Sequence, residues 1–228
     1  MNKKVIYTCI TGGYEKLREP SFVNDDFDYI CFADNESIKS DIWQIKEIPS
    51  EFNEYSNVKK QRLVKILAHK MLPEYDLSIY VDGAILVKGD MNEFIKEVVD
   101  DEHSVFIPQH PDRKCLYDEA NAVMRLKKDT SDKPKKQMKF YKEEGFPPKC
   151  GLTQNNIMLR KHMDADCIRL MELWAEQIKE YSHRDQLSLM YCEWKTGVDV
   201  KKIDKKTCES KWFSWDKFHG KKKQKNSL

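Results

Sequence analysis

The sequence has no cysteine pair at CxxC spacing, no apolar run long enough to cross a membrane, no internal repeat and no flexible inter-domain linker. Its seven cysteines lie singly along 228 residues, which indicates reduced thiols rather than a disulfide framework or a zinc site. We expect no signal peptide, because the strand-like run after Lys3 and Lys4 is short and no cleavage site follows it. These absences predict a cytoplasmic chain that forms a single domain over residues 1–228.

An excess of one charge is also missing, since 40 basic and 38 acidic residues give a net charge of +2. This balance, together with the lack of RNP, KH or zinc patterns, disfavours nucleic-acid binding. Positive charge is local instead, with seven lysines in 127–142 and a KKKQK run near the C-terminus. Because each basic residue near an anionic membrane contributes about 1 kcal/mol, we expect peripheral contact with the inner face of a membrane.

The apolar content of 40% is enough for a core, and alternating or continuous apolar runs predict the elements that enclose it. The order of strands and helices predicts an α/β fold with a mixed sheet flanked by helices. Strands are expected over 4–11, 27–33, 42–48, 78–81, 84–87, 104–108, 155–159 and 198–203, and helices over 56–71, 90–99, 113–128, 133–145, 164–181 and 184–194.

The segment LSIYVDGAILV, residues 77–87, is the most informative part of the chain. It places Asp82 between two apolar runs, and an acid at the end of a buried strand is costly unless something pairs with it. Gly83 lets the backbone turn there or lets a ligand approach closely. Open α/β sheets bind ligands at this edge, so a metal ion that holds a diphosphate would explain Asp82. The alternative is an Asp-Gly turn that joins two hairpin strands.

Several motifs in order resemble one family of glycosyltransferase-like proteins, which has long been catalogued as a domain of unknown function. Its members occur in bacterial polysaccharide gene clusters and among plant Golgi proteins. The resemblance covers nearly the whole chain and is carried by VIYTCITGGYEKL with Pro20, DYICFAD, Trp43, Arg62 with Lys65, SIYVDGAILV, HPDRKCLYDEA from His110, GLTQNNIMLR from Gly151 and RDQLSLMY from Arg184.

The same order is similar to family-eight glycosyltransferases such as glycogenin. The resemblance implies a GT-A fold, a Rossmann-like sheet that binds UDP-sugars with manganese through a DxD motif and a late histidine. Asp82 matches the first Asp of DxD, Ala84 replaces the second, and His219 matches the late histidine. We therefore expect Mn²⁺ or Mg²⁺ on Asp82, His219 and the diphosphate. The missing ligand leaves metal-independent transfer open.

The resemblance also implies a donor site. Arg62 and Lys65 lie three apart on one predicted helix and could bind phosphates, or form a solvated helix face. Asp34 could bind the base or ribose, or make a turn. The remaining nucleotide- and sugar-binding candidates are Thr8, Thr11, Gly12, Tyr14, Asp82 with Gly83, Asn155 and Asn156.

Catalytic candidates lie in the second half of the chain. His110 and Glu119 could serve as the base that activates an acceptor, although Arg113 could pair with the acid structurally. Asp185 and Gln186 would face the anomeric carbon in a retaining reaction, or Asp185 could be an acid at a helix N-terminus. We expect 1–110 to form the nucleotide-binding half and 111–228 the acceptor half with a basic tail.

The sequence thus predicts a hexosyltransferase that uses a UDP-sugar and a glycan or lipid-linked acceptor in surface polysaccharide synthesis. One alternative is a sugar-nucleotidyltransferase, for which TGGYEKLRE supplies only part of the usual phosphate loop. Another is a nucleotide- or glycan-binding relative without catalysis, because Ala84 removes an acid.

Overall fold

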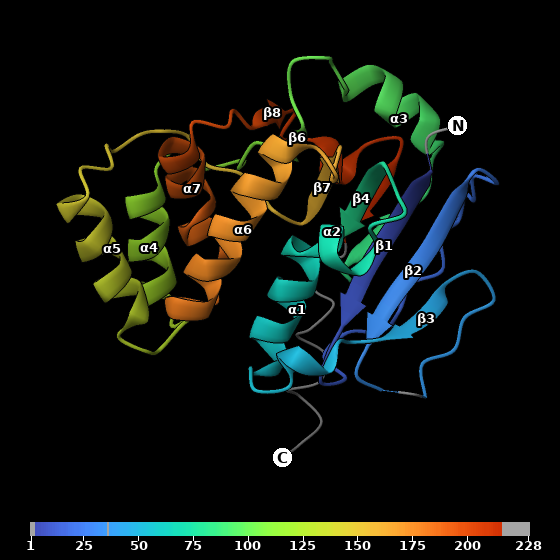
Figure 1. The fold of residues 1–228 in the computed structure, drawn as a ribbon, viewed down its shortest axis with the longest axis horizontal. Helices are drawn as coiled ribbons and strands as arrows, with labels where there is room; N and C mark the ends of the chain where they lie inside the picture. The colour runs from blue at the N-terminus through green and yellow to red at the C-terminus, as the bar shows by residue number, and fades with distance from the viewer. Residues whose placement is uncertain (1–2, 36, 216–228) are drawn as a thin grey trace.

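The computed structural model describes residues 3–35 and 37–215. Its main sheet has seven strands in the order β3-β2-β1-β4-β7-β6-β8 (Figure 1). The first four of these strands are parallel to one another, β7 is antiparallel to both of its neighbours, and β8 is parallel to β6. The strands are β1 (Lys4–Ile10), β2 (Phe27–Ala33), β3 (Gln44–Glu47), β4 (Leu77–Val81), β6 (Val105–Pro108), β7 (Ile157–Arg160) and β8 (Lys201–Ile203).

A second sheet consists of β5 (Ile85–Val87) and β9 (Phe213–Trp215), which pair antiparallel. The chain does turn after β4, where the Ile85 N–H donates to the Asp82 carbonyl at 2.8 Å. The hairpin alternative is nevertheless wrong, because β4 pairs with β1 and β7 on its two edges and β5 pairs with β9. Strand β9 was not predicted from the sequence.

Helices cover both faces of the sheet and extend beyond its β6–β8 end (Figure 1). The face that carries Tyr7 and Cys9 packs against α1, α2 and α6, and the face that carries Ile6 and Ile10 packs against α3 and the small sheet. The helices are α1 (Asn57–Ile66), α2 (Ala68–Met71), α3 (Met91–Val98), α4 (Leu116–Arg125), α5 (Lys133–Glu143), α6 (Ala165–Glu180) and α7 (Leu189–Thr196), with 3-10 turns η1 (Ser50–Phe52), η2 (Asp185–Leu187) and η3 (Thr207–Glu209).

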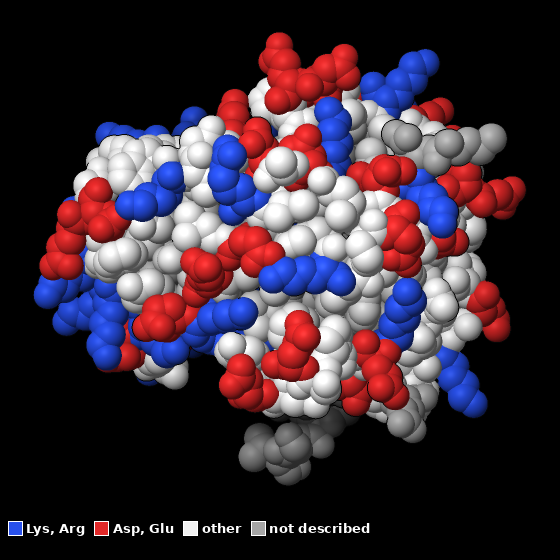
Figure 2. Space-filling view, viewed as in Figure 1, with Lys and Arg blue, Asp and Glu red and all other residues white. Residues whose placement is uncertain are grey.

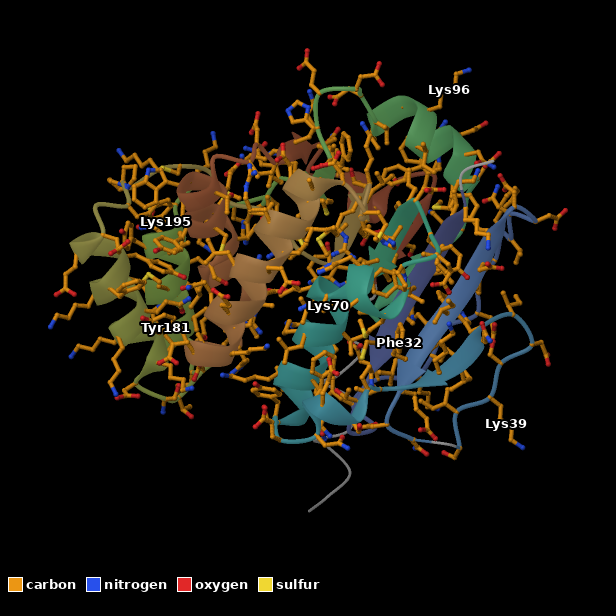
Figure 3. The ribbon with its side chains drawn as sticks, in the orientation of Figure 1. Phe32, Lys39, Lys70, Lys96, Tyr181 and Lys195 are labelled. Atoms are coloured by element: carbon orange, nitrogen blue, oxygen red, sulfur yellow. The ribbon has the colours of Figure 1, made fainter. Side chains whose placement is uncertain are left out.

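Side chains fill the layer between the sheet and these helices (Figure 3). Phe32, labelled there on β2, belongs to the same buried group as Leu63 of α1 and Trp174 of α6. Since successive strand residues point to opposite faces, each strand of the sheet contributes to two cores. None of the described helices is both long and apolar enough to cross a bilayer. All seven cysteines are free thiols, as predicted.

The helix predicted over 56–71 is interrupted at Leu67, which separates α1 from α2. Arg160 of β7 is fully buried there, and its guanidinium donates to the Ile66 carbonyl at 3.0 Å. A side chain inserted into the hydrogen-bond ladder is a recognised cause of such breaks. The helix predicted over 184–194 is also wrong in its bounds, because Asp185–Leu187 forms a 3-10 turn and α7 begins at Leu189.

Candidate functional site

Two adjoining cavities lie at the carboxyl ends of β1 and β4. The central cavity, of about 490 Å³, is lined by residues from α1, α4, η2 and the segment before β7. The loop cavity, of about 460 Å³, lies beside the segment that follows β1. Four residues line both cavities, namely Arg62, Asp82, Lys128 and Arg184.

The wall of the central cavity contains a cluster of paired charges. Lys65 is fully buried, and its ammonium lies 2.7 Å from the Asp185 carboxylate and also donates to the Asn155 carbonyl. The Arg62 guanidinium lies 3.4 Å from Asp185 and 3.8 Å from Asp82. The interpretation of Arg62 and Lys65 as a solvated helix face is therefore wrong, because both side chains face inward and are paired with acids.

These pairs determine the protonation of the cluster. Burial alone would raise the pKa of Asp185, but Lys65 and Arg62 outweigh it and hold that pKa far below its usual range. Burial would likewise lower the pKa of Arg62, and Asp185 with Asp82 raises it instead. Asp185 is thus an ionised carboxylate at neutral pH, and Arg62 is a cation.

Asp82 lies at the end of β4, as predicted, and its contacts use one oxygen. Oδ1 accepts hydrogen bonds from the Tyr80 hydroxyl at 2.8 Å and from the Gln61 amide at 3.3 Å. The same Oδ1 is 3.8 Å from both Arg62 Nη1 and Lys65 Nζ. The Asp82 N–H donates to the Asn156 carbonyl at 2.8 Å, which fixes the carboxylate relative to the chain before β7.

Asn155 and Asn156 present amide donors at the wall of the central cavity. The Asn155 side-chain oxygen accepts from the Thr153 hydroxyl at 2.6 Å, and that of Asn156 accepts from the Cys208 thiol at 3.0 Å. Their amide nitrogens, in contrast, are buried and have no hydrogen-bond partner in the described structure. Buried donors without a partner are costly, so this arrangement suits ligand oxygens that would accept from them.

Gln186, His110 and Glu119 line the same cavity. The Gln186 amide donates to the Thr153 carbonyl at 3.1 Å, which fixes its side chain at the wall. His110 Nδ1 accepts the N–H groups of Asp112 and Arg113 at 3.1 and 3.0 Å. Burial, and then Arg113, lower the pKa of His110, so the ring is neutral at pH 7, and its Nε2 lies 3.3 Å from Nη2 of Arg113.

Both proposed bases therefore have prior partners. For His110 to accept a proton on Nδ1, that atom would have to release two backbone hydrogen bonds. Glu119 is 1% exposed and forms an ion pair with Arg113. The predicted ion pair between Glu119 and Arg113 is therefore confirmed. Glu119 also lines the central cavity, so its role as a base stays a prediction.

The loop cavity is lined by the segment that follows β1, including Thr11, Gly12 and Tyr14. The Thr11 hydroxyl donates to the Asn57 carbonyl at 2.9 Å, which ties this segment to the start of α1. Gly12 has a φ of 62°, and a β-carbon there would lie 2.5 Å from the Asn57 amide, so this position requires glycine. Tyr14 is 69% exposed at the rim, where its ring is accessible to a ligand.

Three predicted nucleotide-binding residues, Thr8, Asp34 and Gly83, line neither cavity. Thr8 is buried in β1 and points to the opposite face from Cys9, which lines the loop cavity. Asp34 borders a separate hollow beside β3, and its carboxylate accepts the Gly12 N–H at 2.8 Å. Direct contact of Thr8 or Asp34 with a ligand in these cavities is therefore not what the structure indicates. Asp34 instead supports the shape of the Gly12 turn.

Glu15 was missed by the sequence reasoning, although it lies in the TGGYEKL motif. It lines the loop cavity, and its carboxyl group lies directly over Gly83, where a β-carbon would come within 2.3 Å of it. Gly83 thus allows Glu15 to approach the Asp82 turn. Burial, and then the charge of Asp82, raise the pKa of Glu15 to about 7. The sequence also did not predict Arg184, Lys128 or Gln61 as site residues. Of the three, only Arg184 has a sequence signal, because it precedes Asp185.

Of the protein ligands expected for Mn²⁺ or Mg²⁺, the described residues contain only Asp82, so the metal stays a prediction. In residues 3–35 and 37–215, no three His, Cys, Asp or Glu side chains are grouped so that they could hold a metal. Asp82 Oδ1 already has two hydrogen-bond donors and two cations around it. Ala84 lines neither cavity, and His219 lies outside the described residues, so its role as a ligand stays a prediction.

Comparison with known proteins places this geometry in a family. A model described as TOD1/MUCI70, glycosyltransferase-like domain, matches residues 1–219. The probable hexosyltransferase MUCI70 of Arabidopsis thaliana is 26% identical over 136 residues, which make up 56% of this chain and 23% of the plant protein. The match therefore spans less than a quarter of that relative's length.

One solved structure supports the fold. The bifunctional glycosyltransferase WbbM in its apo form has a TM-score of 0.50 at 10% identity, and the match covers 89% of this chain and 39% of WbbM. The apo form of mouse xyloside xylosyltransferase 1 has a TM-score of 0.48 at 12% identity, and the match covers 87% and 84%. The predicted GT-A-like α/β class is confirmed. The family match also confirms the resemblance drawn from the ordered motifs, and the chain belongs to the TOD1/MUCI70 family of glycosyltransferase-like domains.

Proposed function

We propose that the protein is a hexosyltransferase that binds a nucleotide-sugar, with UDP as the nucleotide, across the two cavities. The observation that carries the proposal is their shared wall, because Arg62, Lys128 and Arg184 lie where the cavities meet. A diphosphate joins a nucleoside to a sugar, and guanidinium groups bind phosphate oxygens well. The loop cavity then receives the nucleoside, beside Tyr14, and the central cavity receives the sugar.

The central cavity has the chemistry that a hexose requires. Asn155 and Asn156 offer amide donors, and Asp185 offers a carboxylate that Lys65 and Arg62 keep ionised. Hydroxyl groups both donate and accept, so a wall with both kinds of partner orients the ring. An ionised Asp185 is also placed to stabilise positive charge that develops at the anomeric carbon as the diphosphate leaves.

Binding and turnover test the proposal separately. Calorimetry of the full chain should give saturable binding for UDP and tighter binding for UDP-glucose or UDP-galactose than for UDP-xylose, which carries a pentose. Asp185→Asn should still bind UDP. Its rate of UDP release from the preferred donor should fall by 100-fold or more, because the carboxylate charge is gone. A protein that binds none of several nucleoside diphosphates would refute the proposal.

We propose further that the acceptor is a glycan or lipid-linked saccharide of surface polysaccharide synthesis and that α5 contacts an anionic membrane at its cytoplasmic face. Five lysines lie on α5, and a group of basic side chains gathers at the end of the molecule that α4 and α5 occupy (Figure 2). Two of them pair with acids of the same segment, Lys136 with Asp132 and Lys139 with Glu143. Sedimentation with phosphatidylserine vesicles but not phosphatidylcholine vesicles would support the contact, and equal sedimentation with both would contradict it.

A further inference from the structure

The shared wall of the two cavities has an excess of positive charge. Arg62, Arg184 and Lys128 line both cavities and supply three cations there, and Asp82 supplies one anion, which leaves a net charge of +2. Glu15 would reduce this sum by at most one, and its pKa of about 7 keeps it partly neutral at physiological pH. A diphosphate diester with one negative charge on each phosphate matches this excess without any added cation.

The arginines in this wall act on each other as well as on the acids. Burial, and then the charge of Arg62, lower the pKa of Arg184. Nε of Arg184 is buried and has no hydrogen-bond partner in the described structure, whereas Nε of Arg62 lies 3.4 Å from the Asp185 carboxylate. An anion between the two guanidinium groups would relieve their repulsion and could accept from Nε of Arg184.

Asp82 is arranged to hold these cations. Its Oδ1 lies 3.8 Å from both Arg62 and Lys65 and accepts from Tyr80 and Gln61. A divalent ion at this carboxylate would lie among like charges, position 84 supplies no second carboxylate, and the neighbouring Glu15 carboxyl group, with a pKa of about 7, is partly protonated and so a weaker ligand. The carboxylate therefore serves the basic side chains, which in turn face the junction of the cavities.

We propose that the protein binds the diphosphate of its donor through Arg62, Lys65, Lys128 and Arg184 and that this binding requires no divalent metal. The inference rests on the proposed function, because it concerns the same nucleotide-sugar site. These cations would neutralise the diphosphate as it leaves, which is the task of the metal in an enzyme that uses one. Because an ammonium or guanidinium binds phosphate electrostatically, affinity should fall as ionic strength rises.

The test compares UDP binding by calorimetry in EDTA, in Mn²⁺ and in Mg²⁺, with the full chain and UDP as the probe. The expected result is a dissociation constant that differs by less than threefold among the three conditions. Arg184→Gln and Lys128→Gln should each weaken binding at least tenfold in EDTA. Arg169→Gln is the matched control, since Arg169 lies on the exposed side of α6 and pairs with Asp166 at 3.0 Å, and its binding should be unchanged.

The outcomes separate the two proposals. UDP binding that appears only with Mn²⁺ or Mg²⁺ would overturn the metal-independent site and leave the transferase intact. No binding of any nucleoside diphosphate in any condition would overturn the transferase itself and this inference with it. Equal binding by Arg184→Gln, Lys128→Gln and the parent chain would also overturn the inference. If Arg184→Gln fails to fold by circular dichroism, Lys128→Gln decides the result alone.

Discussion

Replacing Asp185 by Asn should destabilise the protein by about 3 kcal/mol, because it leaves the Lys65 ammonium buried without its main partner. Lys65 is fully buried, Asp185 is 5% exposed, and the two charges are 2.7 Å apart. Removing one partner of such a buried pair costs about 3–5 kcal/mol. The lower end applies because Lys65 keeps the Asn155 carbonyl and has Asp82 at 3.8 Å.

Urea denaturation at pH 7 measures this loss as a lower midpoint at constant slope. The double variant Lys65→Met with Asp185→Leu should recover at least about 1 kcal/mol relative to Asp185→Asn, since no buried charge is then unpaired. Asp132→Asn is the control, because its pair with Lys136 is exposed on both sides, and its urea midpoint should be the same as that of the parent chain. A loss below about 1 kcal/mol for Asp185→Asn would refute the reasoning.

The same pair should also show in the pH dependence of stability. The pKa of Asp185 is lowered in the folded state, so the unfolded state binds more protons in acid. The stability that Asp185 contributes is therefore present above its unfolded pKa near 3.8 and is lost as the pH falls towards the folded value. In Asp185→Asn this part of the acid-induced loss should be absent. An identical acid limb in both proteins would contradict the assignment.

Three further predictions concern the ligand. The affinity for a UDP-sugar should fall by up to about tenfold per pH unit above pH 7, because Glu15, with a pKa of about 7, becomes an anion beside the diphosphate. In calorimetry from pH 6.5 to 8.5, the affinity of Glu15→Gln should not change with pH. Asn155→Ala should lower the affinity for a UDP-sugar by about three- to tenfold, since it removes one hydrogen-bond donor to the sugar. Its affinity for UDP should be unchanged in the same assay. Gly83→Ala should displace the Glu15 side chain, from which its β-carbon would be 2.3 Å away, and abolish the pH dependence while lowering stability by about 1 kcal/mol or less in urea denaturation.

Much of the sheet could be predicted because its signal is local. The runs around Ile6, Ile30 and Ile79 are apolar and contain β-branched and aromatic residues, and each forms a central strand. The position of Asp82 at a strand end follows from the same pattern. That Lys65 and Asp185 would meet did not follow, because 120 residues separate them in the chain and only the packing of η2 against α1 joins them.

The wrong predictions for Thr8 and for the helix at Leu67 depend on contacts that sequence periodicity does not indicate. Thr8 alternates with Cys9 along β1, but the alternation does not tell which face will carry α1 and the loop cavity. The break at Leu67 depends on Arg160, which comes from β7 and takes the Ile66 carbonyl. The sequence near Leu67 is a good helix by its own spacing, so only the contact with a distant strand explains the interruption.

The net charge of the donor site likewise depends on segments that are distant in the sequence. Arg62, Lys128 and Arg184 come from three segments, and each alone resembles an ordinary surface cation in the sequence. Their effect depends on a sum, because three cations against one anion at the wall that both cavities share attract a diphosphate, whereas a balanced set would not. The effect of Ala84, which replaces the second acid, can be judged only from this net charge. A site with an acid at that position would have less positive charge and a better metal ligand, so Ala84 and the cations where the cavities meet both favour binding of the diphosphate by side chains.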